Sequence, residues 1–470
     1  MFRLNLKSLL LSSLALACFA AQAAPDPQPL NVIIILTDDQ GYQDLGCYGS
    51  PDIKTPAIDG LAAEGMRFTD YYVASPVCSA SRAALLTGQY PQRVGVRGVF
   101  FPNRGVHGLD PKHVTIAEML KGIGYQTKAV GKWHLGDEKA YLPTNQGFDS
   151  YYGIPYSNDM TPAKSMDYAE DCVFREGMSL AKVEESFSAK KKGGFSTRLR
   201  NKVPLMRDAI CIEFPVDQST ITRRYADEAL TFVRESVAAE KPFFLYLAHS
   251  MPHTPLYASA DFSGKSERGL YGDVIEEIDY NVGRLLSELE TLGIDENTLV
   301  IYTSDNGPWL VKGENGGSAL PLFEGKMTNF EGGQRVPAIM RWPSHIPAGS
   351  TCSELALSMD LLPTIASITN APLPQATLDG RNIFDLITAK PGATTPHQYF
   401  FFGNNAVRSG DWKYHAKEVF KVKTTKRPDN GPTLYNLKDD IGESQNVIAE
   451  HPEIAARLQK ALAAHAQLKQ

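Results

Sequence analysis

Residues 31–39, Asn31-Val32-Ile33-Ile34-Ile35-Leu36-Thr37-Asp38-Asp39, form a continuous apolar, β-branched run that ends in two carboxylates. Such a run predicts a strand buried on both faces, as in a parallel sheet. The polar residues that follow would lie at the sheet edge where open α/β folds bind ligands. Two adjacent carboxylates favour a hard divalent cation with oxygen ligands; a solvated turn is the alternative interpretation.

Three further apolar runs end in polar residues in the same way. They are residues 125–130 before Gly131-Lys132-Trp133-His134-Leu135-Gly136, residues 241–248 before His249-Ser250-Met251-Pro252-His253-Thr254-Pro255, and residues 297–304 before Asp305-Asn306-Gly307. Helical patterns alternate with these runs at residues 55–65, 114–121, 221–238 and 271–292. This alternation predicts an α/β fold with a large mixed, mostly parallel sheet flanked by helices. The polar residues are then expected at one edge of the sheet. Lys132 and His134, two apart, would face the same side of an extended segment.

A cysteine precedes a helical stretch in Ser75-Pro76-Val77-Cys78-Ser79-Ala80-Ser81-Arg82-Ala83-Ala84-Leu85-Leu86-Thr87-Gly88. The preceding residues 68–73 predict a strand, and Gly88 can end the helix in the left-handed conformation. Cys78 is therefore expected at a helix N-terminus, which favours an anion, with Arg82 one turn away. This combination suggests covalent chemistry on a tetrahedral oxyanion. A buried structural cysteine is the alternative.

The N-terminus predicts export. Arg3 and Lys7 precede the apolar residues 9–21 and the small-x-small sequence Ala21-Gln22-Ala23. We expect a signal peptide over residues 1–23, cleaved after Ala23 or Ala24, and a periplasmic or secreted protein. The alternative of a lipoprotein modified at Cys18 is less favoured than a cleaved signal peptide. No other run is long enough for a membrane span, and the net charge of −6 does not favour nucleic-acid binding.

An exported protein can form disulfides, and four cysteines remain besides Cys18 and Cys78: Cys47, Cys172, Cys211 and Cys352. They allow three pairings, of which Cys172 with Cys211 is favoured because both lie in residues 151–216, where regular patterns are lost. That segment also carries a basic run with Lys190, Lys191, Lys192, Arg198, Arg200 and Lys202. The run is either a solvated loop or a substrate-facing insertion.

Proline-rich boundaries at residues 371–374 and 395–396 predict a second, smaller unit. Residues 399–402, 405–407 and 412–415 predict a short antiparallel sheet, and residues 452–468 predict a terminal helix. We therefore expect a catalytic domain over residues 24–375 and a C-terminal subdomain over residues 376–470.

These motifs resemble those of the formylglycine-dependent (type I) sulfatases of the alkaline phosphatase superfamily, in the branch of arylsulfatase A and N-acetylgalactosamine-6-sulfatase. Residues 78–88 are similar to the family pattern Cys-x-Pro-x-Arg followed by Thr-Gly, with Ala80 in place of the proline. The resemblance extends over residues 31 to about 437. It also rests on Asp38-Asp39, residues 131–136, residues 252–255, residues 304–307, and Lys326 with Glu331 and Arg335.

The resemblance implies a hydrolase of sulfate monoesters in which a maturation enzyme converts Cys78 to formylglycine. The hydrated aldehyde would be the nucleophile. The implied Ca²⁺ ligands are Asp38, Asp39, Cys78, Asp305 and Asn306. The implied catalytic residues are Cys78, Arg82 to orient the hydrate, Lys132 and Lys326 at the sulfate, His134 to take a proton from the hydrate, and His253 to protonate the leaving oxygen. Glu331 and Arg335 would hold their loop together, and His249 would lie behind the site.

The implied substrate is a sulfated polysaccharide or oligosaccharide, such as carrageenan, another algal galactan, or a glycosaminoglycan. Two alternatives remain at this stage: a phosphonate or phosphodiester hydrolase of the same superfamily, and a non-catalytic protein that binds sulfated glycans. Proton-transfer groups such as His134 and His253 argue against the second alternative, since a binding module does not need them.

Overall fold

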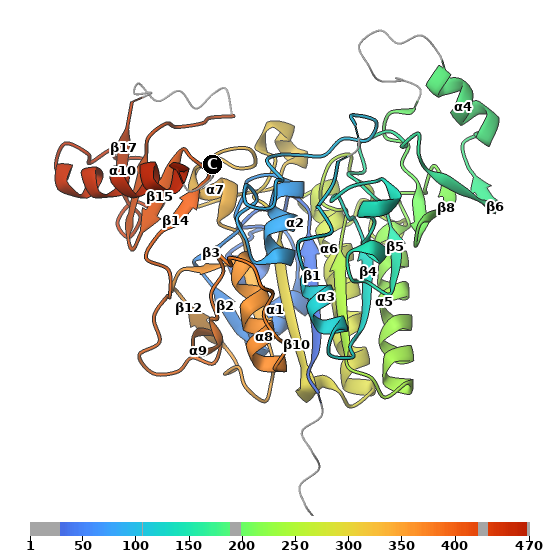
Figure 1. The fold of residues 1–470 in the computed structure, drawn as a ribbon, viewed down its shortest axis with the longest axis horizontal. Coiled ribbons are helices and arrows are strands. Elements are labelled where there is room, and N and C mark those ends of the chain that lie inside the picture. The colour runs from blue at the N-terminus through green and yellow to red at the C-terminus, as the bar shows by residue number, and fades with distance from the viewer. Residues whose placement is uncertain (1–28, 106, 189–198, 422–430, 468–470) are drawn as a thin grey trace, which may run out of the picture.

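The computed structural model describes residues 29–105, 107–188, 199–421 and 431–467 (Figure 1). The expected signal peptide, with its cleavage positions Ala23 and Ala24, lies outside the described residues, as do Lys190, Lys191, Lys192 and Arg198. No helix in these described ranges is long and apolar enough to cross a membrane.

A large mixed sheet forms the centre of the fold, as expected. Its core is parallel: β1 (Asn31–Thr37) lies between β10 (Thr298–Ser304) and β9 (Phe243–Ala248), and β9 pairs with β4 (Gln126–Gly131). All residues of β1, β9 and β10 are buried, which explains their uninterrupted apolar sequences.

The sheet extends beyond this core on both sides, to eleven strands within the described residues. On one side follow β11 (Ala338–Arg341), β2 (Met66–Phe68) and β12 (Ser350–Cys352). On the other side follow β5 (Ser150–Gly153), β7 (Leu205–Arg207), β8 (Ile210–Phe214) and β6 (Asp167–Phe174).

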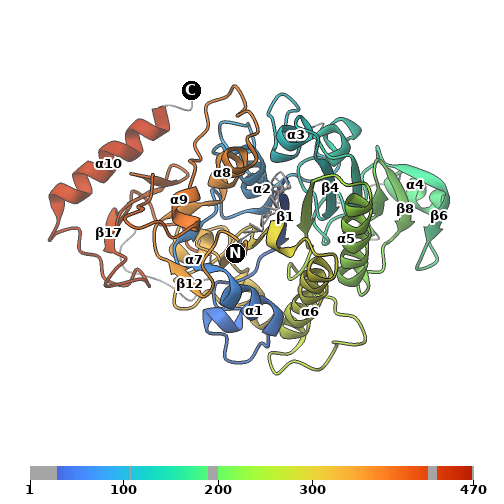
Figure 2. The same cartoon turned by 90° about the horizontal axis from the view of Figure 1, so that it is seen from below.

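Helices cover both faces of the sheet (Figure 2). One layer consists of α1 (Pro56–Glu64), α5 (Ile221–Ala238) and α6 (Leu270–Thr291). The other consists of α2 (Cys78–Thr87), α3 (Ile116–Lys121) and α8 (Leu361–Thr369). Shorter elements are α4 (Leu180–Ser188), α7 (Glu331–Gln334), α9 (Phe384–Ile387) and the paired strands β3 (Tyr71–Tyr72) and β13 (Ala356–Leu357).

Three sequence-based expectations need correction. The strand expected over residues 68–73 is divided into β2 and β3. The helix expected from residue 114 begins at Ile116, because Thr115 and Glu118 form a capping box there. The segment 151–216 is not irregular throughout, since β5, β6, β7 and β8 extend the main sheet; its short strands are separated by loops that obscure the pattern.

The expected disulfide between Cys172 and Cys211 is also not formed. Every cysteine among the described residues is a free thiol. Cys172 and Cys211 nevertheless lie on the neighbouring strands β6 and β8, where the Cys211 thiol donates to the carbonyl of Glu213 at 3.4 Å. Proximity was therefore predicted correctly, whereas the covalent bond was not.

The C-terminal part forms a small antiparallel sheet beside the main one, as expected. It contains β14 (Phe400–Phe402), β15 (Ala406–Ser409), β16 (Trp412–His415) and β17 (Thr433–Asn436), packed against α10 (Pro452–Gln467). Strand β17 was not predicted from the sequence, because it is only four residues long. The boundary at residues 375 and 376 stays a prediction.

The strand register places the polar motifs side by side. Thr37 pairs with Ser304 across β1 and β10, and Leu36 pairs with Ala248 across β1 and β9. Ala248 in turn pairs with Gly131 of β4. Asp38, Asp305 and Lys132 directly follow these strand ends, so the backbone alone brings them to one edge of the sheet.

Candidate active site

Carboxylates and a thiol form a buried group at this edge. Asp38, Asp39, Cys78 and Asp305 each place one potential ligand atom within 4.8 Å of the others. None is more than 2% exposed. The backbone of Asp39 is left-handed, with φ of 65°, and its N–H donates to Asp305 at 3.2 Å. The structure thus brings the expected carboxylates together.

Three buried cations face these three carboxylates. Lys132 Nζ donates to Asp38 Oδ2 at 2.5 Å, and Lys326 Nζ donates to both oxygens of Asp39 at 2.6 and 2.8 Å. Arg82 Nε donates to Asp305 Oδ2 at 2.9 Å. Arg82 also lies 3.8 Å from Asp38 and donates to the carbonyl of Lys132 at 2.6 Å. These residues were all predicted, although Arg82 contacts the carboxylates and not the Cys78 side chain directly.

The charged side chains of this site shift one another's pKa values. Burial raises the pKa of Asp38, but Lys132, His253 and Arg82 outweigh it and hold that pKa well below its usual value. Burial raises the pKa of Asp39 to about 6, against the opposing effect of Lys326. The pKa of Lys326 is raised because Asp39 and other nearby anionic groups outweigh burial, so this lysine stays protonated.

Cys78 lies at the first position of α2, where the sequence placed it. Its thiol donates to Asp38 Oδ1 at 3.5 Å and receives a hydrogen bond from Lys326 at 3.4 Å. Gly88 ends the helix in the left-handed conformation, with φ of 66°. Burial raises the pKa of the Cys78 thiol despite Lys132 and Lys326, which disfavours the nucleophilic thiolate.

His253 lies over Asp39, with 3.7 Å between Nε2 and Oδ2. Its other ring nitrogen contacts Asn158 Oδ1 at 3.1 Å, and Asn158 in turn donates to Gln218 at 3.0 Å. Burial, reinforced by Lys326, lowers the pKa of His253 well below its usual value. The sequence motif around His253 predicted that residue, whereas no local motif distinguishes Asn158 and Gln218, which were not predicted.

His134 and His249 are both buried near this edge. The expected extended segment is not found, because His134 has a left-handed backbone with φ of 61°. Its Nε2 contacts the carbonyl of Phe100 at 3.0 Å, while its Nδ1 has no partner among the described residues. Neither ring nitrogen of His249 has a partner in the described part of the chain, and burial lowers its pKa to about 4.

Ion pairs hold the loop that carries Lys326, as expected for Glu331 and Arg335. Arg335 bonds to Glu331 at 3.3 Å and to Asp70 at 2.8 Å. The C-terminal sheet contributes as well, because Lys413 lies 2.8 Å from Glu331. The smaller sheet therefore supports the loop that carries a lysine of the buried group.

The donor set suits a calcium ion. Asp38, Asp39 and Asp305 offer carboxylate oxygens, the ligands that hard divalent cations prefer. Asn306 donates its amide to Asp39 at 2.8 Å, while its buried Oδ1 accepts no hydrogen bond from the described residues. An unpaired buried acceptor is costly, and a bound cation would satisfy it.

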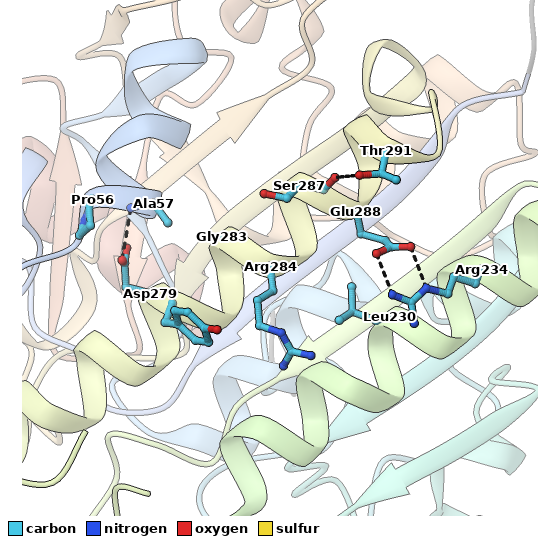
Figure 3. A pocket seen from close by; sticks show the side chains of 11 residues that line it. Pro56, Ala57, Leu230, Arg234, Asp279, Gly283, Arg284, Ser287, Glu288 and Thr291 are labelled. Carbon is cyan, nitrogen blue, oxygen red and sulfur yellow. Dashed lines mark hydrogen bonds and ion pairs between the residues drawn. The ribbon is translucent and has the colours of Figure 1, made fainter. Parts of the chain in front are cut away.

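A separate groove of about 550 Å³ lies in the helical layer, between α1, α5 and α6 (Figure 3). Its walls carry the ion pair of Arg234 with Glu288 at 2.7 Å, and Asp279, which accepts from the backbone of Ala57 at 3.2 Å. None of the predicted site residues lines it. The groove is thus distinct from the buried group described above.

Comparison with known proteins agrees with this geometry. Residues 30–371 match the model of the sulfatase family, and residues 321–468 match that of the N-sulphoglucosamine sulphohydrolase C-terminal domain. The chain belongs to the formylglycine-dependent sulfatase family. It is accordingly a sulfuric ester hydrolase, which decides against the non-catalytic alternative.

Individual relatives of this sulfatase cover most of the chain. Arylsulfatase A of Homo sapiens is 38% identical over 97% of this chain and 91% of its own length. N-acetylgalactosamine-6-sulfatase of Canis lupus familiaris is 40% identical over 86% of this chain and 74% of its own length. Among solved structures, Ps i-CgsB in complex with k-i-k-neocarrahexaose is 32% identical, with a TM-score of 0.75 over 94% of both chains.

Proposed function

We propose that this sulfatase is exported to the periplasm or secreted, and that it hydrolyses sulfate monoesters of a sulfated polysaccharide with formylglycine at position 78. The observation that carries the proposal is the place of Cys78 at the N-terminus of α2, between Asp38 and Lys326. Its raised pKa keeps the unmodified side chain in the neutral thiol form, which is a poor nucleophile. Oxidation of Cys78 by a maturation enzyme would instead supply an aldehyde that is hydrated in water. One hydroxyl of this hydrate would attack the sulfur atom of the sulfate ester.

Calcium would be held by Asp38, Asp39, Asp305, Asn306 and the modified residue 78. The bound ion would supply Lewis acidity toward a sulfate oxygen. With three carboxylates matched by Lys132, Lys326 and Arg82, the protein group is close to neutral by itself. Adding a divalent ion leaves a positive excess that favours an anionic sulfate ester.

The protein's own side chains divide the remaining tasks. Lys132 and Lys326 offset charge on the sulfuryl oxygens, while Arg82 fixes the carboxylates and, through them, the orientation of residue 78. His253, oriented by Asn158, donates a proton to the leaving oxygen. His134 accepts a proton from the hydrate of residue 78 through Nδ1, which has no partner in the described part of the chain.

A sulfated glycan is the best-supported substrate class. The relative Ps i-CgsB was solved with k-i-k-neocarrahexaose, and another relative is an N-acetylgalactosamine-6-sulfatase. We therefore propose a carrageenan-type galactan or a glycosaminoglycan.

The test combines sulfate release with detection of the aldehyde. Protein from the native host is incubated with k-i-k-neocarrahexaose and with a chondroitin oligosaccharide sulfated on N-acetylgalactosamine, and free sulfate is measured. The tryptic peptide of residues 68–82 is labelled with a hydrazine-type carbonyl probe and analysed by mass spectrometry. We expect labelling at position 78 and sulfate release, both abolished in Cys78→Ala. An unlabelled thiol in active protein would overturn the formylglycine mechanism.

The same experiment addresses phosphonate and phosphodiester hydrolysis. Lys132 and Lys326 form a compact pair of cations that would also attract a phosphoryl group, so both ester classes are compared at equal concentration. We expect a higher kcat/KM for sulfate esters. A higher kcat/KM for phosphate diesters would replace the proposed function.

A further inference from the structure

Trp309 lies next to the reactive side chains, although its sequence carries no recognised motif. It lies two residues after Gly307, the last residue of Asp305-Asn306-Gly307, and precedes the short 3₁₀ helix η6 (Leu310–Asn315). Its ring centroid is 5.4 Å from that of His253 and 4.8 Å from Lys326 Nζ. The segment is tied to the lysine loop, since the N–H of Lys326 donates to the carbonyl of Pro308 at 2.9 Å.

The exposure of Trp309 differs from that of its neighbours. His253 and Lys326 are only 4% and 6% exposed, whereas Trp309 is partly exposed. Trp309 also belongs to none of the hydrophobic clusters formed by the described residues. Core packing therefore does not account for this large ring, which lies between the buried group and solvent.

The position of His253 defines where the leaving sugar must lie. A group that protonates the leaving oxygen must approach it to about 3 Å. The sugar attached to that oxygen then extends away from the buried sulfate, toward the partly exposed side. A ring 5.4 Å from His253 is within contact distance of such a sugar. Tryptophan presents a rigid apolar face to the C–H groups of a sugar ring.

Lys312 adds a charge to the outer side of this ring. Its Nζ lies 4.1 Å from the Trp309 centroid, and the residue is exposed. A lysine ammonium at this place can pair with a second sulfate or a carboxylate on the leaving side of an anionic glycan.

We propose that Trp309 and Lys312 form the contact for the leaving sugar and determine which sulfated glycan is accepted. The proposal rests on the proposed sulfatase function. Trp309 stacks on the sugar that carries the departing oxygen, and Lys312 pairs with an anionic group on that sugar or the next one.

The variants Trp309→Ala, Trp309→Phe and Lys312→Ala test this contact, with Lys460→Ala on α10 as the matched control for an exposed lysine. The substrate is whichever of k-i-k-neocarrahexaose and the chondroitin oligosaccharide the parent cleaves with the higher kcat/KM. We expect Trp309→Ala to raise KM about tenfold, which corresponds to about 1.4 kcal/mol, and Trp309→Phe to restore most of the loss. Lys312→Ala should raise KM in a salt-dependent way, while Lys460→Ala should leave KM unchanged.

Inhibition by inorganic sulfate distinguishes two possible roles of Trp309: contact with the leaving sugar, and support of the buried side chains. Inorganic sulfate has no leaving group, so its inhibition constant should stay the same in Trp309→Ala. An unchanged KM, or an inhibition constant that rises together with KM, would overturn the proposal.

A failure of the proposed function would be recognised differently, because the unsubstituted protein itself would then release no sulfate. In that case binding of k-i-k-neocarrahexaose is measured by calorimetry. A tenfold loss of affinity in Trp309→Ala would still support the contact, and equal affinities would refute it.

Discussion

Replacing Lys326 by methionine should weaken catalysis and, at the same time, strengthen calcium binding. The ammonium lies 2.6 and 2.8 Å from the two oxygens of Asp39 and 3.4 Å from Cys78 Sγ. Four of the proposed ligands, Asp38, Asp39, Cys78 and Asp305, place one ligand atom each within 4.8 Å of the others, so an ion among them is a close neighbour of this ammonium. At an effective dielectric constant of about 20, two unit charges about 4 Å apart interact by about 4 kcal/mol.

Methionine removes this repulsion while keeping a similar apolar stem. Allowing for screening and rearrangement, we expect calcium to bind at least about tenfold more tightly to Lys326→Met, equivalent to about 1.4 kcal/mol. The value of kcat should fall by about 10²- to 10³-fold, as when one preorganised donor to a charged transition state is lost. Calcium affinity is measured by calorimetry after treatment with a chelator, and kcat by sulfate release.

Lys128→Met is the matched control for this substitution. Lys128 is also 6% exposed, and it pairs with Glu228 at 2.6 Å, outside the buried group. Its replacement should leave calcium affinity unchanged. Equal or weaker calcium binding in Lys326→Met would refute the inference that the Lys326 ammonium repels an ion bound at Asp39.

Three further predictions concern protonation and buried charge. Burial and Lys326 lower the pKa of His253, so its proton-donating form is lost as pH rises through that lowered pKa. The kcat/KM for the sulfated oligosaccharide should then fall by up to about tenfold per pH unit. A flat profile of kcat/KM from pH 5 to 8 would contradict this prediction. Burial raises the pKa of Asp279 from 3.8 to about 7, so the folded state keeps a proton that the unfolded chain has lost. The free energy of unfolding should fall with rising pH between about 4 and 7, by up to about 1.4 kcal/mol per unit, and urea denaturation of Asp279→Asn should lack this component. Lys413→Met removes a buried cation shared by two buried carboxylates, Glu331 at 2.8 Å and Glu443 at 3.1 Å, and should cost about 3–5 kcal/mol in urea denaturation. An equal loss in Lys390→Met, an exposed lysine, would show that the burial of Lys413 is not the cause.

The sequence predicted those parts of the fold and site whose signals are local. Residues 31–36 and 297–304 carry uninterrupted apolar runs, so their strands and the polar residues at their ends could be placed. The start of α2 at Cys78 and its end at Gly88 follow from helix propensity and the left-handed conformation that glycine allows.

What the sequence did not predict depends on contacts between distant segments. β7 and β17 are three and four residues long, and their pairing is decided by neighbouring strands rather than by a repeated pattern. Asn158 and Trp309 adjoin His253 only because of the tertiary fold. Cys172 and Cys211 were predicted as neighbours from shared location, but proximity alone does not decide whether two thiols are oxidised.

The balance of charge in the site bears on when Cys78 can be modified. The three carboxylates are paired with Lys132, Lys326 and Arg82, so the group is compensated before any ion or aldehyde is present. The unmodified chain should therefore be able to fold. Once folded, Cys78 is 1% exposed and inaccessible to a maturation enzyme. The proposed conversion of Cys78 must then precede folding. A formylglycine-generating enzyme added to the native thiol form should give no carbonyl labelling, while the urea-denatured chain should be labelled; labelling of the native form at the same rate would show that the site opens in the folded state.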